Sequence, residues 1–239
     1  MQRAVLSGHP QDKRIGKSQL SQYVQWLFEL GGIGDVRELI IETFVKDRSL
    51  YPSTFHGSKK VVWWNDVNEN PWCYNPSNTF WFTANASDGS PGHWVYYDTN
   101  GTEWNSYTLG HQKMGSHTFC QSFSLMYAIS HLTGNKVTKM LVRQLQSGGS
   151  KKEYADNMLL VIQFWQYVLM QLSIKKQAKM VELIKTLNRE YKDSRVVNRR
   201  GEYRENYVIA EDEDSITLEM INHRLESMKQ NVEEMVDVL

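Results

Sequence analysis

Residues 92–132 contain a histidine, an amide and a cysteine in that order: His93, Asn105 and Cys120. A thiol nucleophile needs these side-chain types. The thiolate attacks a carbonyl carbon, an imidazole acts as base and then as acid, and an amide or carboxylate fixes the imidazole tautomer. Taken alone, Cys120 is better explained as a packing residue, because unpaired cysteine is often buried. The ordered trio, however, favours covalent acyl-transfer chemistry.

The residues that follow Cys120 predict a helix. Apolar residues recur at three- and four-residue spacing from Phe123 to Leu132, and Ser116 or Thr118 could cap the helix. Cys120 then falls in the first turn, where unbonded backbone N–H groups and a partial positive charge favour a thiolate and can hold an oxyanion. We therefore expect the pKa of this thiol to be lowered.

A hairpin is predicted before the helix. Residues 93–97 carry tryptophan, valine and two tyrosines, residues 98–101 are typical of a turn, and residues 102–108 form a returning strand. This pairing brings Asn105 back towards the histidine strand. Asp98 is the rival orienting group, but a strand of five residues spans about 17 Å, so Asp98 is better explained as a turn residue.

Other histidines compete for the role of base. His111 and His117 both precede Cys120 closely, and His131 lies further along the predicted helix. We favour His93, because a base on a separate strand can face the thiol, whereas a neighbour in the same turn usually cannot align with it. His131 is expected at the polar edge of the helix.

This pattern resembles the adenovirus-protease and SUMO-protease group of cysteine peptidases over residues 92–132, about a sixth of the chain. His93 and the tryptophan after it resemble the His-Trp pair of that group. Asn105 lies where the group has a strand-end acid, Gln112 resembles its oxyanion-hole glutamine, and Cys120 resembles its nucleophile. The chain departs from the group in having Asn for the acid, a glutamine eight residues before the cysteine, and Gln121 where glycine is frequent.

The resemblance implies an α+β fold with a papain-like core, which is a small mixed sheet flanked by helices. It implies a thiol endopeptidase that cleaves viral structural precursors, with cleavage after Gly-Gly as one form, and a polypeptide substrate. Two alternatives remain open: an isopeptidase that removes ubiquitin-like or SUMO-like modifiers, and a catalytically disabled protease fold that serves as a virion scaffold. No cofactor is expected, and no metal, since Cys73 has no ligand at suitable spacing.

Composition excludes several classes of protein. Lys plus Arg and Asp plus Glu number 27 each, so a zero net charge argues against whole-chain affinity for nucleic acid. A nucleic-acid-binding function, through the aromatic segment 51–90 and the arginine-rich segment 192–204, is the weakest alternative. Burial in a hydrophobic core explains the aromatic residues better. Two cysteines are too few for a disulfide-rich secreted module. The sequence shows no hydrophobic signal region and no apolar run long enough to span a membrane. We therefore expect a soluble intracellular protein, in the host cytoplasm or packaged in the virion.

The expected domains are a peptidase-like core, residues 1–147, and a helical extension, residues 148–239. Gly148 and Gly149 interrupt the helical pattern, as a linker does, although a Gly-Gly pair is also a conceivable self-cleavage site. The extension has one long helical region, residues 153–191, with enough apolar residues for burial on more than one side. Its last helix, residues 216–238, has a coiled-coil-like stripe that docks on the domain or on a partner helix.

Overall fold

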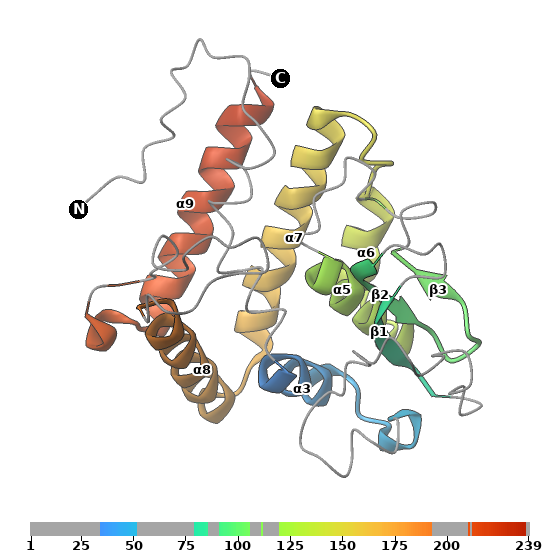
Figure 1. The fold of residues 1–239 in the computed structure, drawn as a ribbon, viewed down its shortest axis with the longest axis horizontal. Helices are drawn as coiled ribbons and strands as arrows, with labels where there is room; N and C mark the ends of the chain where they lie inside the picture. The colour runs from blue at the N-terminus through green and yellow to red at the C-terminus, as the bar shows by residue number, and fades with distance from the viewer. Residues whose placement is uncertain are drawn as a thin grey trace.

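The structure is a computed structural model that describes residues 34–51, 79–85, 91–105, 111, 120–192, 210 and 212–237. Within these ranges it is a mostly helical α+β protein (Figure 1). The candidate residue Gln112 lies outside the described residues, as do the two proposed caps, Ser116 and Thr118, and Cys73. The expected basic cluster between 192 and 204 is outside them as well, apart from Lys192.

The sheet has three strands in the order β1 (Trp81–Asn85), β2 (Pro91–Tyr97) and β3 (Glu103–Trp104). Both pairings are antiparallel, with Tyr96 opposite Trp104, so the expected mixed sheet is wrong for the described strands. The reason is that β2 and β3 are joined by a tight hairpin, which allows only antiparallel pairing.

Asp98 closes this hairpin, as expected for a turn residue. Its Oδ1 accepts hydrogen bonds from the N–H groups of Asn100 at 2.8 Å and Thr102 at 2.9 Å, and Gly101 has a φ of 78°. Within residues 102–105 of the predicted returning strand, β3 covers Glu103–Trp104, and Asn105 leaves the extended conformation with a φ of 72°. Residues 106–108 of that prediction lie outside the described residues.

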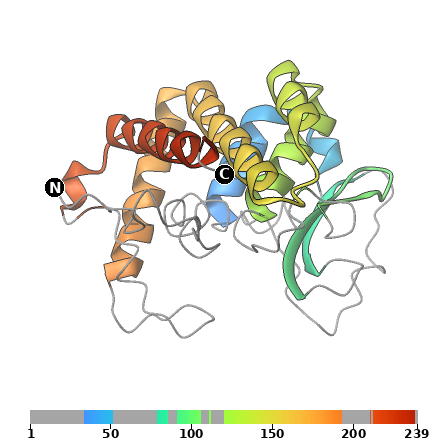
Figure 2. The same ribbon diagram turned by 90° about the horizontal axis from the view of Figure 1, so that it is seen from above.

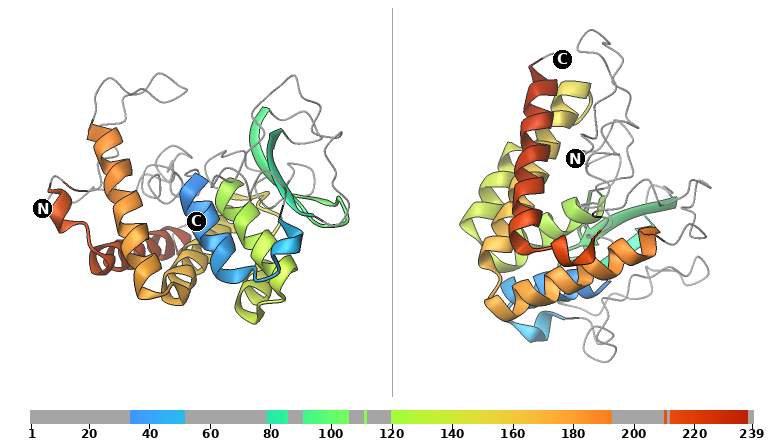
Figure 3. Two further views of the ribbon diagram at one scale, coloured as in Figure 1. Left: turned by 90° about the horizontal axis from the view of Figure 1, so that it is seen from below. Right: turned by 90° about the vertical axis from the view of Figure 1, so that its left-hand side faces the viewer.

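Three helices cover one face of the sheet or lie beside it. These are α3 (Gly34–Phe44), α5 (Cys120–Thr133) and α6 (Lys136–Gln144). Helix α5 packs against β2, α6 packs against α5, and α3 lies between α5 and α8 (Figure 3). On β2, Tyr96 is fully buried in the main hydrophobic core, and Trp94 packs against that core. Val95 and Tyr97 form a separate small cluster. The helix predicted after Cys120 is confirmed and begins at that residue.

The C-terminal half consists of α7 (Lys151–Gln171), α8 (Ile174–Lys192) and α9 (Leu218–Val236), with short 3-10 turns at Arg48–Leu50 and Glu213–Ser215. The predicted single helical region is therefore two helices, because Leu172 adopts an extended ψ of 134°. Helix α9 lies beside α7, as Figures 1 and 2 show, and buries its apolar stripe there. The stripe thus has an intramolecular partner. Among the described helices, none is long and apolar enough to cross a membrane.

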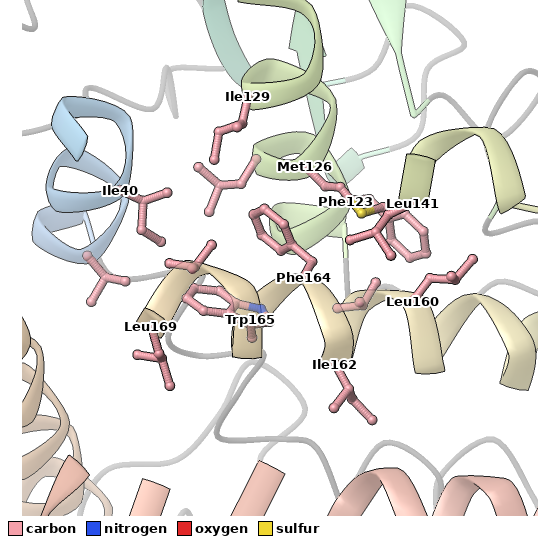
Figure 4. Packing of buried hydrophobic residues seen from close by; sticks show 14 of the residues in the cluster. Ile40, Phe123, Met126, Ile129, Leu141, Leu160, Ile162, Phe164, Trp165 and Leu169 are labelled. Carbon is pink, nitrogen blue, oxygen red and sulfur yellow. The ribbon is translucent and has the colours of Figure 1, made fainter. Parts of the chain in front are cut away.

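Helix α7 is buried on two sides, as its composition predicted. Phe164 points towards Met126 and Phe123 of α5, whereas Ile162 points away from α5 towards α9 (Figure 4). Trp165 also contacts α5, where its Nε1 donates a hydrogen bond to Ser122 Oγ at 3.0 Å. The resulting hydrophobic core is continuous from α3 to α9 and crosses the expected domain boundary at residue 148. The division into two domains stays a prediction.

Candidate active site

Cys120 is the first residue of α5, and only 1% of its surface is exposed. Burial raises the pKa of its thiol to about 12, although three backbone N–H groups, those of Trp94, Gln121 and Cys120 itself, act in the opposite direction, as does Arg37. The expected lowering of this pKa by the helix start is therefore wrong for the structure described. Loss of solvation outweighs the helix terminus and the cation together.

His93 lies in β2, and the structure describes its backbone but not its side chain. The next residue, Trp94, is joined to the start of α5. Its carbonyl oxygen accepts hydrogen bonds from Asn105 Nδ2 and from Ser124 Oγ, both at 3.2 Å, and its N–H points at the Cys120 thiol. The backbone beside His93 is consequently fixed against the residue that carries the sulfur.

Asn105 lies immediately after β3, and 2% of its surface is exposed. Its Nδ2 donates to the carbonyl oxygens of Trp94 and Cys120, each at 3.2 Å. One amide group thus connects β2, the end of β3 and the start of α5. Asparagine is one of the few residues other than glycine that adopt a positive φ readily, and this explains why it can turn the chain inward here.

The sequence predicts that Asn105 orients the imidazole of His93 through a hydrogen bond. The hydrogen bonds in the described part of the chain use Nδ2 to hold backbone carbonyls, a structural task that the sequence did not reveal. An amide has a separate acceptor, Oδ1, which is the atom that would receive an imidazole N–H. The two tasks are compatible, and the orienting role stays a prediction.

His111, the residue before Gln112 in the sequence, is held against the start of the C-terminal half of the chain. The carbonyl oxygen of His111 accepts a hydrogen bond from Asn157 Nδ2 at 3.0 Å, and its ring Nδ1 lies 2.7 Å from the carbonyl oxygen of Gln146. Asn157 is fully buried and also holds Gln146, through the N–H at 2.8 Å and the carbonyl at 3.0 Å. His111 is therefore held in place by Asn157 and Gln146, and sequence reasoning missed Asn157 altogether.

Gly148 and Gly149 precede a well-formed helix start. Gly148 has a φ of 65° and packs on the carbonyl group of His111, where an added Cβ would lie 2.2 Å from the oxygen. The residues after them form a capping box, in which Ser150 Oγ accepts a hydrogen bond from the N–H of Glu153 in the first turn of α7, and Glu153 Oε2 accepts one from the N–H of Ser150. This geometry favours the helix boundary over the self-cleavage site, because a protease binds its scissile residues in an accessible, extended backbone.

Arg37 is a second residue that sequence reasoning missed. It lies on α3 with 4% of its surface exposed, and its guanidinium carbon is 5.4 Å from the centre of the Trp94 ring. Burial lowers its pKa well below the usual value, and the neighbouring Cys120 raises it. The sequence does contain a signal that could have identified Arg37. It is a basic residue on the apolar face of α3, one turn before the buried Ile41.

His131 stacks among aromatic rings at the far end of α5. Its ring centre is 4.3 Å from Trp104, 5.7 Å from Tyr96 and 6.2 Å from Tyr127. Burial lowers its pKa, and Asp98 on the hairpin raises it. The side chain of His131 is exposed, as expected for the polar edge of the helix, and it lies eleven residues after Cys120 on α5. Among the described residues, no group of three His, Cys, Asp or Glu side chains could hold a metal ion.

Comparison of the chain with protein-family models, with curated proteins and with solved structures gives no match.

Proposed function

We propose that this chain is a papain-like cysteine peptidase, a thiol endopeptidase whose nucleophile is Cys120. The observation that carries the proposal is the pair of hydrogen bonds from Asn105 Nδ2 to the carbonyl oxygens of Trp94 and Cys120. Through them the strand that bears His93, the amide and the cysteine converge, although they are distant in sequence.

In the proposed reaction, His93 accepts the thiol proton and the sulfur of Cys120 attacks a peptide carbonyl carbon. The oxyanion so formed is held by Gln112 and by backbone N–H groups at the start of α5. The C–N bond then breaks as His93 gives its proton to the leaving amine. Water, deprotonated by His93, releases the acyl group from sulfur, and Asn105 orients the imidazole throughout.

The proposed substrate is a polypeptide, and maturation of viral structural precursors is its favoured context. Removal of a ubiquitin-like or SUMO-like modifier after Gly-Gly is the related alternative. Both need a carbonyl carbon to reach the sulfur of Cys120, which is 1% exposed. An active peptidase must therefore open this site in the free chain as well as with substrate, and the opening would restore the thiolate by relieving the burial that raises its pKa.

A second candidate function is a structural or scaffold component of a virion on a disabled protease fold. The burial of Cys120 and a thiol pKa of about 12 favour it, because buried cysteines with raised pKa values are chemically inert. The continuous core that joins the C-terminal helices to the sheet suits such a component equally well.

Alkylation of the thiol separates the two functions. The chain has two cysteines, so a Cys73→Ser background leaves Cys120 as the single reactive group. The rate of iodoacetamide labelling is measured between about pH 5 and pH 9, alone and with His93→Ala, and Cys120→Ser gives the blank. Fast labelling that persists below about pH 7 and is lost in His93→Ala supports the peptidase. Slow labelling that rises only at alkaline pH, unchanged by His93→Ala, rejects it in favour of the scaffold.

A further inference from the structure

Two large apolar side chains project from the corner where α7 ends and α8 begins. Met170, in the last turn of α7, is 76% exposed, and Ile174, the first residue of α8, is 86% exposed. Leu172 between them is 4% exposed and belongs to the main hydrophobic core. The corner is thus fixed by one buried side chain, while the apolar side chains before and after it face solvent. We call residues 170–179 the α7–α8 corner; it lies beside α3 (Figure 1).

Basic side chains lie next to these two apolar residues. The first two turns of α8 expose Lys175 and Lys179, which are four residues apart and therefore share one face of the helix. Ile174 and Ala178 are exposed beside them, at the same spacing. The opposite face of α8, which carries Met180, is buried in the core. The exposed face thus presents an isoleucine and two lysines together.

Further cations reach the corner from the end of α3. Lys176 Nζ donates a hydrogen bond to Thr43 Oγ1 at 2.8 Å, and Lys46 Nζ donates one to the carbonyl oxygen of Thr43 at 2.6 Å. Two ammonium groups are therefore held at one threonine. Arg48, in the 3-10 turn that follows, lies 3.5 Å from a carboxylate oxygen of Glu42, and its side chain is 67% exposed.

The charges at the corner are unbalanced. Among the described residues, the acids there are Glu42 and Asp47, and the bases are Lys46, Arg48, Lys175, Lys176 and Lys179. Burial lowers the pKa of Lys176, Glu42 opposes the shift, and the cations at positions 46, 179 and 48 lower the pKa further. The whole chain has no net charge, so this positive excess is local. Because like charges held together repel one another, an anionic partner would stabilise them.

We propose that the α7–α8 corner docks on an anionic lipid surface, where Met170 and Ile174 enter the boundary of the acyl chains and the basic side chains contact the headgroups. Such a surface offers an apolar layer beneath a layer of negative charge, and the corner presents the complementary pair of features. This docking is independent of the proposed peptidase function.

The two apolar side chains favour lipid over other polyanions. Nucleic acid attracts lysine and arginine through its phosphates, but phosphate contacts make no use of an exposed methionine and isoleucine. A docked peptide helix needs a hydrophobic groove, and the walls of a groove would cover the side chains that line it. Met170 and Ile174 are too widely exposed to line one. A lipid surface instead takes up apolar side chains that project from the protein.

The test is co-sedimentation of the full chain with vesicles of phosphatidylcholine alone, and with vesicles that contain about 30% phosphatidylserine, at about 0.1 M salt. One double variant, Lys175→Gln with Lys179→Gln, removes two charges. A second double variant, Met170→Gln with Ile174→Gln, removes the apolar pair. All four side chains are exposed, so the fold should be retained, and thermal unfolding of each variant checks this.

Matched controls come from elsewhere on the helical surface. Lys151→Gln with Lys152→Gln removes two exposed lysines from the start of α7, which is the opposite end of that helix from the corner. Met140→Gln removes a methionine that is 52% exposed on α6. These variants change the net charge and the exposed apolar surface in the same way, but outside the α7–α8 corner.

The unmodified chain is expected to bind the phosphatidylserine vesicles and to leave the phosphatidylcholine vesicles unbound. Loss of the lysine pair should weaken binding about 25-fold, which is about fivefold for each charge. Loss of the apolar pair should weaken binding at least about tenfold. The control variants should bind within about twofold of the unmodified chain, because their positions do not touch the membrane.

Absence of binding to phosphatidylserine vesicles overturns the proposal, as does an equal loss of binding in the control variants. Binding to a DNA duplex or to polyglutamate is measured under the same conditions. If either polyanion binds as tightly as the vesicles and Met170→Gln with Ile174→Gln changes nothing, the corner is a general site for negative charge, and lipid docking is rejected.

Discussion

The side-chain Nδ2 of Asn105 donates a hydrogen bond to the backbone oxygen of Cys120 at 3.2 Å, and both residues are buried. The same nitrogen donates at 3.2 Å to the oxygen of Trp94. A single amide thereby links β2, at the residue after His93, with the start of α5. Both hydrogen bonds need a donor at position 105. The amide of asparagine supplies one, whereas the carboxylate that the resembled peptidases have at this place could not.

Asn105→Asp is expected to destabilise the fold by about 2–4 kcal/mol, because a carboxylate would face two carbonyl oxygens that have lost their donor. The measurement is the urea midpoint at neutral pH. Asn105→Gly is the matched control, since it keeps the positive φ at no steric cost and removes only the amide. We expect it to be less harmful than Asp. An Asp variant as stable as the unmodified chain would show that the two bonds contribute nothing.

Gly148→Ala is expected to be severely destabilising, by about 2–4 kcal/mol, because its φ of 65° disfavours any side chain and its Cβ would meet the His111 oxygen at 2.2 Å. Gly149→Ala is the natural control. A Cβ there meets Ser147 Oγ at 3.4 Å and Glu153 Oε2 at 3.6 Å, which are ordinary contacts. Its effect should stay within about 0.5 kcal/mol. Equal loss of stability in the two variants, measured by thermal unfolding, would refute this account.

The periodic elements were predictable from the sequence, because each repeats its apolar residues at the spacing its own geometry requires. Residues 123–132 predicted α5, and Asp98 was recognised as the hairpin turn. The break between α7 and α8 was missed, since apolar residues continue on both sides of Leu172. The antiparallel sheet was missed because the mixed sheet was inferred from a resemblance and not from the hairpin.

The site was predictable in its residue types and not in its electrostatics. His93, Asn105 and Cys120 were chosen from order and local chemistry, and the structure connects the backbone of Trp94, the residue after His93, with the other two. The raised pKa of the thiol was not foreseen, because burial depends on tertiary packing that no local pattern reveals. Arg37 was missed for the same reason, since it is distant in sequence from Trp94 and its guanidinium lies over that ring only in the folded chain.

Acid conditions should weaken the packing around His131. Burial holds the pKa of this imidazole below its usual value, with Asp98 opposing and Lys139 reinforcing the shift. The unfolded chain therefore binds the proton at higher pH than the folded chain. The contribution to stability is complete above the unfolded pKa and is lost as the pH falls through the folded value.

The measurement is the urea midpoint from about pH 8 to pH 5 in the unmodified chain and in His131→Phe, which keeps an aromatic ring and removes the titration. The difference between the two chains should grow as the pH falls. A difference that stays constant with pH would mean that His131 does not contribute to the acid response. Since the ring is partly exposed, we expect the direction to be reproducible and the size to be modest.

Asn157→Ala is expected to release His111 from its contacts with the C-terminal half. The variant loses three part-buried hydrogen bonds, to the N–H and carbonyl of Gln146 and to the carbonyl of His111. The cost should be about 2–4 kcal/mol. Asp156→Ala is the neighbouring control, because Asp156 bonds Gln146 Nε2 only at the surface, and its loss should cost less than about 0.5 kcal/mol.

The same pair of variants tests whether the contacts of His111 serve the proposed reaction. If Gln112, the next residue, holds the oxyanion, loss of these contacts weakens an interaction made in the transition state, so kcat should fall more than KM rises. Hydrogen exchange at the His111 amide reports the loss of these contacts independently of activity. Fast exchange in Asn157→Ala with unchanged kcat would show that the contacts of His111 have no part in catalysis, whereas slow exchange would show that Asn157 does not hold His111 in place.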